Sequence, residues 1–416
     1  MGYETRVRRV VRVLRPEEWN TWYDVLELAF GGVPESPEER SLYESLTETE
    51  RSLGVWDGDD CVGAASAFSF RLSVPGGALV PAAGVTMVGV APTHRRQGVL
   101  TSMMRRQLDD IRAGGEPLAV LTASEPAIYG RYGYGVGTWA VALDIDTSRV
   151  RLTVPPGTDG VRLRLVDPEE ALAACEKVYA ELVPRRPGMP ARQPGWERLG
   201  LLDPEQSREG ASPLKCVLAE RADGRVAGYA RYRVKPDWDV TGSDGVVRVA
   251  DVDALDPQAY AALWRYLFEI DLTWRVEAGR RPVDDPVLHL VTDVRRAQPR
   301  ARDQMHVRLV DLPAALEARR YGSPVDVVFE VEDAFCPWNA GRWRLVGDAN
   351  GASCVRTRDA AGLALSVREL GSAYLGGVAL TSLAGAGRVT ELRPGALAEA
   401  SRAFAGDVAP WLPHFF

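Results

Sequence analysis

The chain has 416 residues, of which 46% are hydrophobic and 26% charged, as in soluble globular proteins. This length exceeds what one hydrophobic core usually supports, so two or three domains are expected. The formal net charge of −7 argues against a general nucleic-acid-binding protein. The 5 cysteines and 4 histidines are scattered, which favours a reducing compartment with free thiols and suggests no metal site.

The first predicted element is a strand in the Arg-rich opening, residues 6–16, which lacks the apolar core of a signal peptide. Further on, the uncharged run 74–92 is nearly long enough to span a bilayer. Its prolines and glycines favour two strands and a turn instead. We therefore expect a cytoplasmic protein without a membrane partner.

A first domain is expected over residues 1–150. A helix is predicted to begin at Pro16, and a hairpin is predicted from residues 53–56 and 61–70, joined by an Asp-Gly turn. Between them, residues 35–51 are rich in Glu. We favour a solvated helix face there, and the alternative is an acidic rim that attracts polycationic amines.

The most informative stretch of this domain begins with a predicted strand, Val85–Ala91, followed by the basic loop THRRQG and a helix opening near Val99. The first turn of a helix has unpaired N–H groups and a positive dipole end, so the loop predicts an anion site strengthened by Arg95 and Arg96. Neither a P-loop nor a GxGxxG fingerprint is present. The alternative is a basic surface turn before an ordinary amphipathic helix.

The same stretch continues with a predicted strand, Ala119–Ala123, and the sequence SEPAIYGRYGYG. Taken alone, this second block could be an aromatic, Gly-rich turn packed on a core.

A second domain is expected over 151–300 and a third over 301–416. In the second, strands are predicted over 215–219, 226–234 and 246–252, followed by a helix over 257–268. In the third, strands are predicted over 307–312, 325–332, 343–347 and 363–369, and helices over 313–319 and 394–404.

Together, VAPTHRRQG and ASEPAIYGRYGYG resemble the Eis (enhanced intracellular survival) family within the GNAT superfamily of N-acetyltransferases. The loop resembles the superfamily's acetyl-CoA pattern Gln/Arg-x-x-Gly-x-Gly/Ala at Arg95, Gly98 and Leu100, where Leu replaces the small residue. The resemblance implies an α+β fold of tandem GNAT domains, with mixed sheets flanked by helices, followed by a sterol-carrier-like domain. Residues 251–256 lack an RRxG loop, so no coenzyme site is expected in the second domain.

The resemblance also implies the cofactor-binding residues for acetyl-CoA. Backbone groups of splayed strands would hold the pantetheine and the carbonyl, and the helix opening would hold the pyrophosphate. The implied set is Val88, Gly89, Val90, Arg95, Arg96, Gln97, Gly98, Val99, Leu100, Thr101, Ser124 and Glu125.

Two catalytic groups follow from the resemblance: Tyr129 as general acid and the α-carboxylate of Phe416 as general base. A free Tyr has a pKa near 10 and a thiol near 8.5, so complete proton transfer would be uphill by about 2 kcal/mol. Tyr129 must therefore be acidified or act in concert. Tyr132 and Tyr134 are rivals for the acid, and His414 is an alternative base.

The family's acceptors are aminoglycoside antibiotics and Lys side chains, and the family assembles as homohexamers. In this chain Phe30-Gly31-Gly32-Val33 and Phe415 stand where acidic acceptor-pocket residues are expected. A small-molecule amine that is smaller or more apolar therefore becomes a candidate acceptor. The alternative from another class is a non-catalytic coenzyme-A-binding or scaffold protein.

Overall fold

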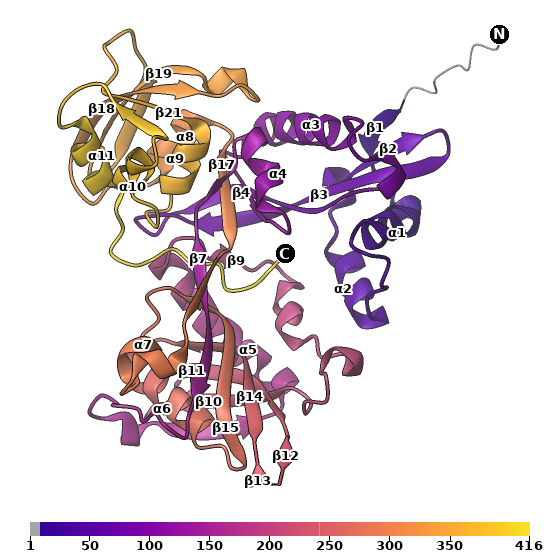
Figure 1. The fold of residues 1–416 in the computed structure, drawn as a ribbon, viewed down its shortest axis with the longest axis vertical. Coiled ribbons are helices and arrows are strands. Elements are labelled where there is room, and N and C mark those ends of the chain that lie inside the picture. The colour runs from indigo at the N-terminus through magenta and orange to yellow at the C-terminus, as the bar shows by residue number, and fades with distance from the viewer. Residues whose placement is uncertain (1–8, 241) are drawn as a thin grey trace. The chain divides into compact units, whose positions relative to one another are not determined.

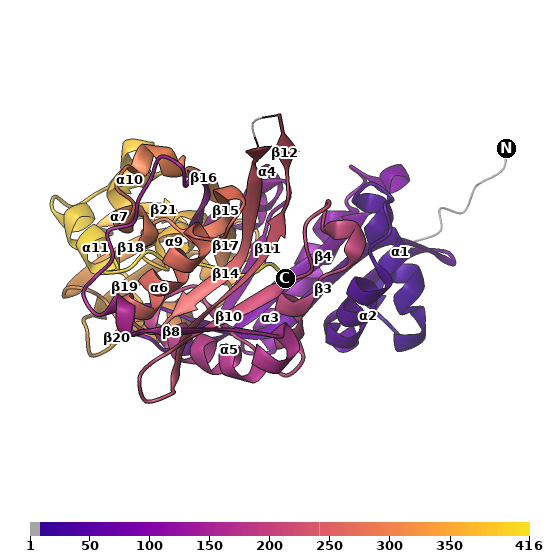
Figure 2. The same ribbon diagram turned by 90° about the horizontal axis from the view of Figure 1, so that it is seen from below.

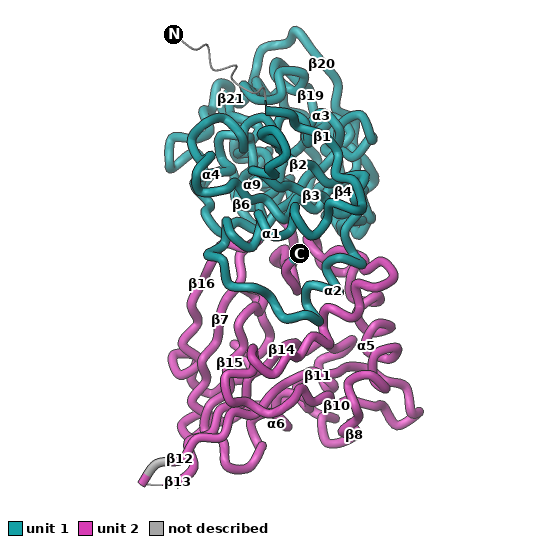
Figure 3. Tube along the Cα trace, turned by 90° about the vertical axis from the view of Figure 1, so that its right-hand side faces the viewer, with its two compact units in different colours: residues 1–137, 305–405, 416 teal, residues 138–304, 406–415 magenta. Residues whose placement is uncertain are grey.

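The computed structural model describes residues 9–240 and 242–416. The chain forms two compact units, shown in different colours in Figure 3. The first contains residues through 137, residues 305–405 and Phe416, and the second contains residues 138–304 and 406–415. The segment expected as a third domain therefore lies largely in the same compact unit as the first.

The first unit is built on a sheet in the order β1-β2-β3-β4-β5-β17-β6. Its strands are β1 (Val10–Val13), β2 (Leu53–Asp57), β3 (Asp60–Ser73), β4 (Leu79–Val90), β5 (Leu118–Thr122), β17 (Met305–Leu309) and β6 (Gly135–Val136). The expected opening strand and hairpin are confirmed, although residues 6–8 lie outside the described residues. The uncharged run 74–92 differs from the prediction of two strands and a turn: it forms the turn at residues 74–78 and one strand, β4, because the partner strand β3 already ends at Ser73.

Helices cover both faces of this sheet (Figure 1). They are α1 (Trp19–Ala29), α2 (Pro37–Leu46), α3 (Val99–Ala113) and the short α4 (Pro126–Tyr129). A Cβ on Gly63 would meet Val99, whereas one on Gly89, which pairs with the next residue of β3, would meet Ala29. Successive strand residues face opposite sides, so α3 and α1 pack on opposite faces. In α2 only Leu46 is buried, as expected for a solvated helix.

The residues 305–405 complete the first sheet and then form a second one. Instead of the predicted strand at 307–312, β17 ends at Leu309 and inserts between β5 and β6. The five-stranded sheet β20-β19-β18-β21-β22 follows. Its strands are β18 (Val325–Glu332), β19 (Gly341–Gly347), β20 (Ala352–Arg356), β21 (Leu363–Ser366) and β22 (Val389–Glu391). The accompanying helices are α8 (Leu312–Ala318), α9 (Val367–Ala373), α10 (Leu380–Gly385) and α11 (Ala396–Phe404).

The prediction of one strand over residues 363–369 is wrong in its second half. The strand ends at Ser366, whose hydroxyl accepts a hydrogen bond from the backbone N–H of Arg368 and caps α9. A Ser at this position supplies a partner for an otherwise unpaired N–H group, so the chain turns into a helix.

The second unit contains a sheet in the order β16-β7-β15-β14-β11-β10-β8. Its strands are β7 (Trp139–Asp146), β8 (Arg162–Val166), β10 (Lys215–Glu220), β11 (Val226–Lys235), β14 (Gly245–Ala254), β15 (Thr273–Pro282) and β16 (Arg300–Asp303). Short elements are β9 (Pro190–Ala191), β12 (Trp238–Asp239), β13 (Gly242–Ser243) and α7 (Val287–Leu290).

Two helices of this unit, α5 (Pro168–Leu182) and α6 (Pro257–Phe268), lie on opposite faces of its sheet (Figure 2). On β10, Cys216 and Leu218 belong to the core with α5, whereas Val217 and Ala219 belong to the core with α6. Across the part of the chain that the structure describes, no helix is long and apolar enough to cross a membrane.

Candidate active site

The first unit contains a cavity of about 740 Å³. Five segments line it: the end of α1, the second half of β4, the basic loop with the start of α3, the residues after β5, and the last residue of the chain. Its lining contains thirteen of the residues implied for the site: Val88, Gly89, Val90, Arg95, Arg96, Gly98, Val99, Leu100, Thr101, Ser124, Glu125, Tyr129 and Phe416. Gln97 is outside it, and its amide donates to the backbone oxygen of Thr93.

The N-terminus of α3 opens onto this cavity without a side-chain cap. Its first flanking residue, Gly98, has a left-handed φ of 84°, and a Cβ placed there would meet nothing within 4 Å. Arg96 also has a left-handed φ of 61°, which is uncommon for a residue with a side chain. The exposed turn therefore leaves N–H groups of the first helical turn available to an anion.

The two arginines of the loop differ in their partners. Arg95 donates to the backbone oxygen of Ala29 at 3.2 Å, at the end of α1. Within the described ranges, the guanidinium of Arg96 forms no hydrogen bond or ion pair, and the residue is exposed. Arg96 is therefore the loop cation that is available to a ligand.

Strands β4 and β5 form a fork beside the helix. They pair in parallel at residues 82–84 and 118–120, and no pairing between them continues beyond Gly84. A bulge follows in β4, where Met87 has a φ of 52° and the register against β3 shifts. The backbone of Val85–Val90 on this side therefore has no partner strand among the described residues, as expected for splayed strands.

The side chain of Phe416 packs beside Gly84, the residue at which the pairing of β4 and β5 ends. It is 9% exposed, and its ring contacts Phe70 edge to face at a centroid distance of 4.9 Å. A Cβ on Gly84 would lie 3.3 Å from the Phe416 ring. A larger residue at Gly84 would therefore compete with both aromatic rings for this space.

Three tyrosines of the second motif have different surroundings. Tyr129 is half-buried and lines the cavity. Tyr132 also lines it, but its hydroxyl hydrogen-bonds the Thr101 hydroxyl at 3.2 Å. Tyr134 is 1% exposed and contributes nothing to the described lining.

Burial is the main reason that the pKa of Tyr129 is raised to about 12, and the neighbouring Tyr132 and Glu125 add to the shift. Its hydroxyl therefore stays protonated at neutral pH. The sequence left two alternatives for Tyr129: a lowered pKa, or proton donation in concert with the reaction. Because the site raises the pKa of Tyr129, the concerted alternative is favoured.

His414, the alternative base, lies in the second unit. Its ring is 6.1 Å from the ring of Trp196 and 6.2 Å from that of Tyr179, measured between centroids. Burial, and then the charge of Arg192, lower the pKa of His414 to about 3. The imidazole is therefore neutral at physiological pH and a weak proton acceptor.

Two further lining residues, Phe30 and Tyr132, were considered in the sequence as an acceptor-pocket position and a rival acid. The lining residues that were not predicted for the site are Ala29, Val85, Thr86, Met87, His94, Thr122, Ile128 and Arg131. Among the described lining side chains, Glu125 is the one carboxylate, while His94, Arg95, Arg96 and Arg131 can carry positive charge. No group of three or more His, Cys, Asp or Glu that could hold a metal ion occurs in residues 9–240 and 242–416.

Comparisons with known proteins agree with this arrangement. Residues 10–137 and 188–309 each match an acetyltransferase (GNAT) domain family, and residues 312–413 match the sterol carrier protein domain family. An uncharacterized N-acetyltransferase of Streptomyces avermitilis is 69% identical over 98% of this chain and 99% of its own.

Two further relatives are mycobacterial. The N-acetyltransferase Eis of Mycobacterium tuberculosis is 36% identical over 89% of this chain and 91% of its own length. The crystal structure of Eis1 from Mycobacterium abscessus matches with a TM-score of 0.83 and 35% identity, over 98% of this chain and 100% of that one.

Proposed function

We propose that this chain, which belongs to the Eis family of GNAT N-acetyltransferases, transfers the acetyl group of acetyl-CoA to a primary amine. The observation that carries this proposal is the cavity itself. It combines an uncapped helix N-terminus, a strand fork, a tyrosine hydroxyl and the chain terminus in one unit.

The residues present fit acetyl-CoA. The exposed opening of α3 beside Arg96 suits a pyrophosphate, and the unpaired edge of β4 at Val88–Val90 offers backbone hydrogen bonds to a pantetheine. The corresponding helix of the second unit differs, because the Asp256 carboxylate accepts from the backbone N–H of Ala259 at 2.8 Å. A carboxylate already accepts from one N–H group at that N-terminus and places negative charge there, which supports a single coenzyme site per chain.

Acetyl-CoA supplies an acetyl group activated as a thioester. In our proposal, backbone groups of Val88–Val90 orient it and the Phe416 carboxylate accepts the amine proton through water. The amine nitrogen bonds to the acetyl carbon as the carbon–sulfur bond breaks. Tyr129 hydrogen-bonds the departing sulfur and passes its proton to it, and water returns the proton released by the amine to Tyr129. A Tyr with a pKa of about 12 lies about 3.5 units above a thiol, so complete proton transfer would cost about 5 kcal/mol. Tyr129 therefore acts while charge develops on the sulfur, and not by prior ionisation.

The acceptor is the finer part of the proposal. Acetylation of aminoglycosides or Lys side chains remains a candidate from the family resemblance. The described lining instead presents the exposed ring of Phe30 and a single acidic side chain, Glu125. We therefore favour a monoamine with an apolar body over a polycation. The homohexamer implied by the resemblance stays a prediction that light scattering of the purified protein can check, and the cytoplasmic location expected from the sequence stays a prediction as well.

Reversing the charge at Arg96 is expected to weaken acetyl-CoA binding by about tenfold or more. The substitution Arg96→Glu places a carboxylate beside the N-terminus of α3, where an anionic pyrophosphate would bind. Isothermal titration calorimetry with acetyl-CoA measures the change. Arg106→Glu is the matched control, because Arg106 lies on the same helix, pairs with Asp110 and is outside the cavity lining. Equal affinities of the two variants would reject the loop assignment.

A panel of amines is expected to show an apolar preference. An arylalkylamine should have a kcat/KM about tenfold above that of an aminoglycoside, since burying a ring against Phe30 contributes about 1.5 kcal/mol. Release of coenzyme A thiol measures both rates. Phe30→Asp should reverse the order, and an aminoglycoside preference in the wild-type protein would contradict the apolar acceptor.

A further inference from the structure

The glycines of the second motif have specific neighbours, all from residues 305–405. A Cβ on Gly130 would lie 2.9 Å from the guanidinium carbon of Arg368. One on Gly133 would lie 2.8 Å from the guanidinium carbon of Arg308, and one on Gly135 would lie 2.1 Å from the backbone oxygen of Arg368. A side chain is therefore excluded at Gly135 by backbone and at Gly133 by an ion-paired guanidinium, and at Gly130 it would displace the guanidinium of Arg368. The glycine spacing creates a surface on which groups from β17 and α9 rest directly against the backbone.

These glycines belong to one continuous segment, residues 126–135, which we call the tyrosine turn. It contains α4 and carries Tyr129 toward the cavity. The turn is internally tied, because the N–H of Tyr134 donates to the oxygen of Tyr129 at 3.3 Å and that of Gly133 to the oxygen of Gly130 at 3.1 Å. A displacement of Gly130 or Gly133 would therefore move Tyr129 with it.

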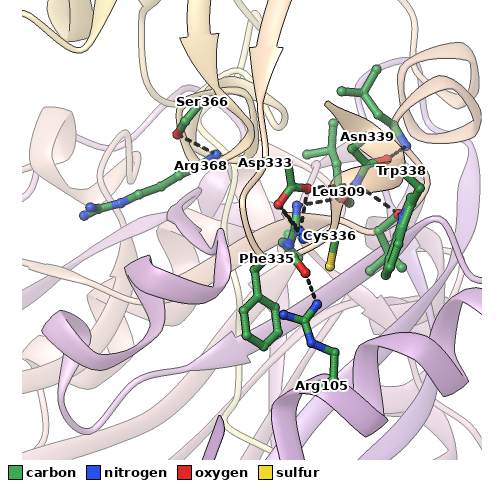
Figure 4. A network of polar contacts seen from close by, with 12 residues as sticks. Arg105, Leu309, Asp333, Phe335, Cys336, Trp338, Asn339, Ser366 and Arg368 are labelled. Atoms are coloured by element: carbon green, nitrogen blue, oxygen red, sulfur yellow. Dashed lines mark hydrogen bonds and ion pairs between the residues drawn. The ribbon is translucent and has the colours of Figure 1, made fainter. Parts of the chain in front are cut away.

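Arg308 is anchored by a buried carboxylate. Its guanidinium donates twice to Asp333, at 2.7 and 2.9 Å, and both side chains are at most 1% exposed. Asp333 also accepts from the backbone N–H of Cys336 and the amide of Asn339, and Asn339 in turn donates to the oxygen of Leu309 (Figure 4). A carboxylate with this many donors fixes Arg308 in one position.

The segment that carries Asp333 also contacts α3. Arg105 lies over the ring of Phe335 at 3.7 Å and donates to its backbone oxygen (Figure 4). The Phe335 ring contacts Tyr132 edge to face at 4.9 Å, and Arg112 lies over Trp338 at 4.4 Å. The Asp333 network is thus fixed to the helix whose N-terminus opens onto the cavity.

Arg368 supports the same turn but has a different environment. In the part of the chain that the structure describes, its guanidinium forms no ion pair, and its buried Nε has no hydrogen-bond partner. Burial, and then the charge of Arg388, lower its pKa. Holding an unpaired cation partly buried costs free energy without a compensating ion pair. The guanidinium lies beside Gly130, where an added Cβ would come within 2.9 Å of it.

We propose that Arg308 and Arg368 are positioning residues that hold the tyrosine turn against the cavity and so fix the Tyr129 hydroxyl. This proposal rests on the assignment of Tyr129 as the general acid. It gives residues 305–405 a role in the reaction that is distinct from binding either substrate. Arg308 is held in place by its ion pair with Asp333. Arg368 has no ion pair among the described residues, so it can be substituted without breaking one.

The test is a double-mutant cycle between Arg368→Ala and Tyr129→Phe in the full-length protein. Arg368→Ala alone should lower kcat about tenfold, because small misplacements of a reacting group are costly. Its affinity for acetyl-CoA, measured by calorimetry, and its KM for the amine should stay unchanged. In the Tyr129→Phe background the same substitution should have no further effect on kcat, because Arg368 acts through that hydroxyl.

Two further variants make the outcome decisive. Arg368→Gln keeps most of the side-chain length and should recover most of the lost kcat. Arg344→Ala removes an exposed partner of Asp326 elsewhere in the same unit and should leave kcat unchanged. Multiplicative losses in the double variant, or a wild-type kcat in Arg368→Ala, would overturn the positioning role. If Tyr129→Phe alone has no effect, the general-acid assignment fails instead, and the two failures are distinguishable.

Discussion

Neutralising the C-terminal carboxylate is expected to lower the acetyl transfer rate by about 10²–10⁴-fold, the usual range for a lost general base. The last residue, Phe416, lines the cavity with its ring fixed between Gly84 and Phe70. A C-terminal tag converts its carboxylate to an amide, which cannot accept a proton at neutral pH. Turnover at saturating amine, measured by thiol release, reports the loss.

The sharpest form of this experiment is a semisynthetic protein that ends in a Phe416 carboxamide. It keeps the aromatic ring packed against Gly84 and Phe70 and removes only the charge, so folding and acetyl-CoA affinity should match those of the native protein. A cleavable tag offers a second comparison, since activity should return when cleavage restores Phe416 as the last residue. An N-terminal tag serves as the control.

Deleting Phe416 separates position from charge. The new terminus, on Phe415, would lie one residue back, a displacement of about 3.3–3.6 Å that exceeds hydrogen-bond tolerance. Activity should therefore fall even though a carboxylate is still present. Equal rates for the carboxamide and native proteins would remove the terminal carboxylate from the mechanism. His414→Ala then becomes the next variant to measure, although the lowered pKa of His414 makes it a poor base.

Replacing Tyr129 by Phe is expected to lower kcat by roughly 10²-fold while leaving acetyl-CoA affinity nearly unchanged. The substitution removes one hydroxyl and keeps the ring, whose contact with Tyr134 at 6.1 Å should survive. Because the raised pKa of Tyr129 is about 12, this hydroxyl is protonated throughout the range of pH 6 to 10. A high-pH decline of kcat within that range should therefore be absent for this group. Stopped-flow or steady-state kinetics across pH, together with calorimetry, measure both effects.

The neighbouring tyrosines supply matched controls. Among residues 9–240 and 242–416 the buried Tyr134 hydroxyl has no hydrogen-bond partner, so Tyr134→Phe should preserve kcat and should not destabilise the fold. Tyr132→Phe removes the hydrogen bond to Thr101 and should have a small effect on kcat. If either control lost more activity than Tyr129→Phe, the choice among the three tyrosines would be wrong.

Local sequence determined the parts of the site that lie close together along the chain. The apolar run before Pro92, the left-handed turn at Gly98 and the helical spacing of Val99, Met103 and Leu108 define a strand, a turn and a helix within thirty residues. Short-range backbone sterics and helix periodicity are sufficient for such a unit. The family resemblance then identified Tyr129 and Phe416 as candidates, which neither periodicity nor composition could do.

Tertiary structure decided what depends on contacts between distant segments. The insertion of β17 beside β5 was not predicted, because the hydrophobic pattern of residues 307–312 predicted a strand but not its neighbours. The glycine spacing of the tyrosine turn was visible in sequence, but its purpose depends on Arg308 and Arg368, more than 170 positions away. Likewise, the sequence of the aromatic tail does not show whether the tail packs on the core. In the structure the ring of Phe416 packs against Gly84 and Phe70. Such placements follow from packing of the whole core, which local propensities do not encode.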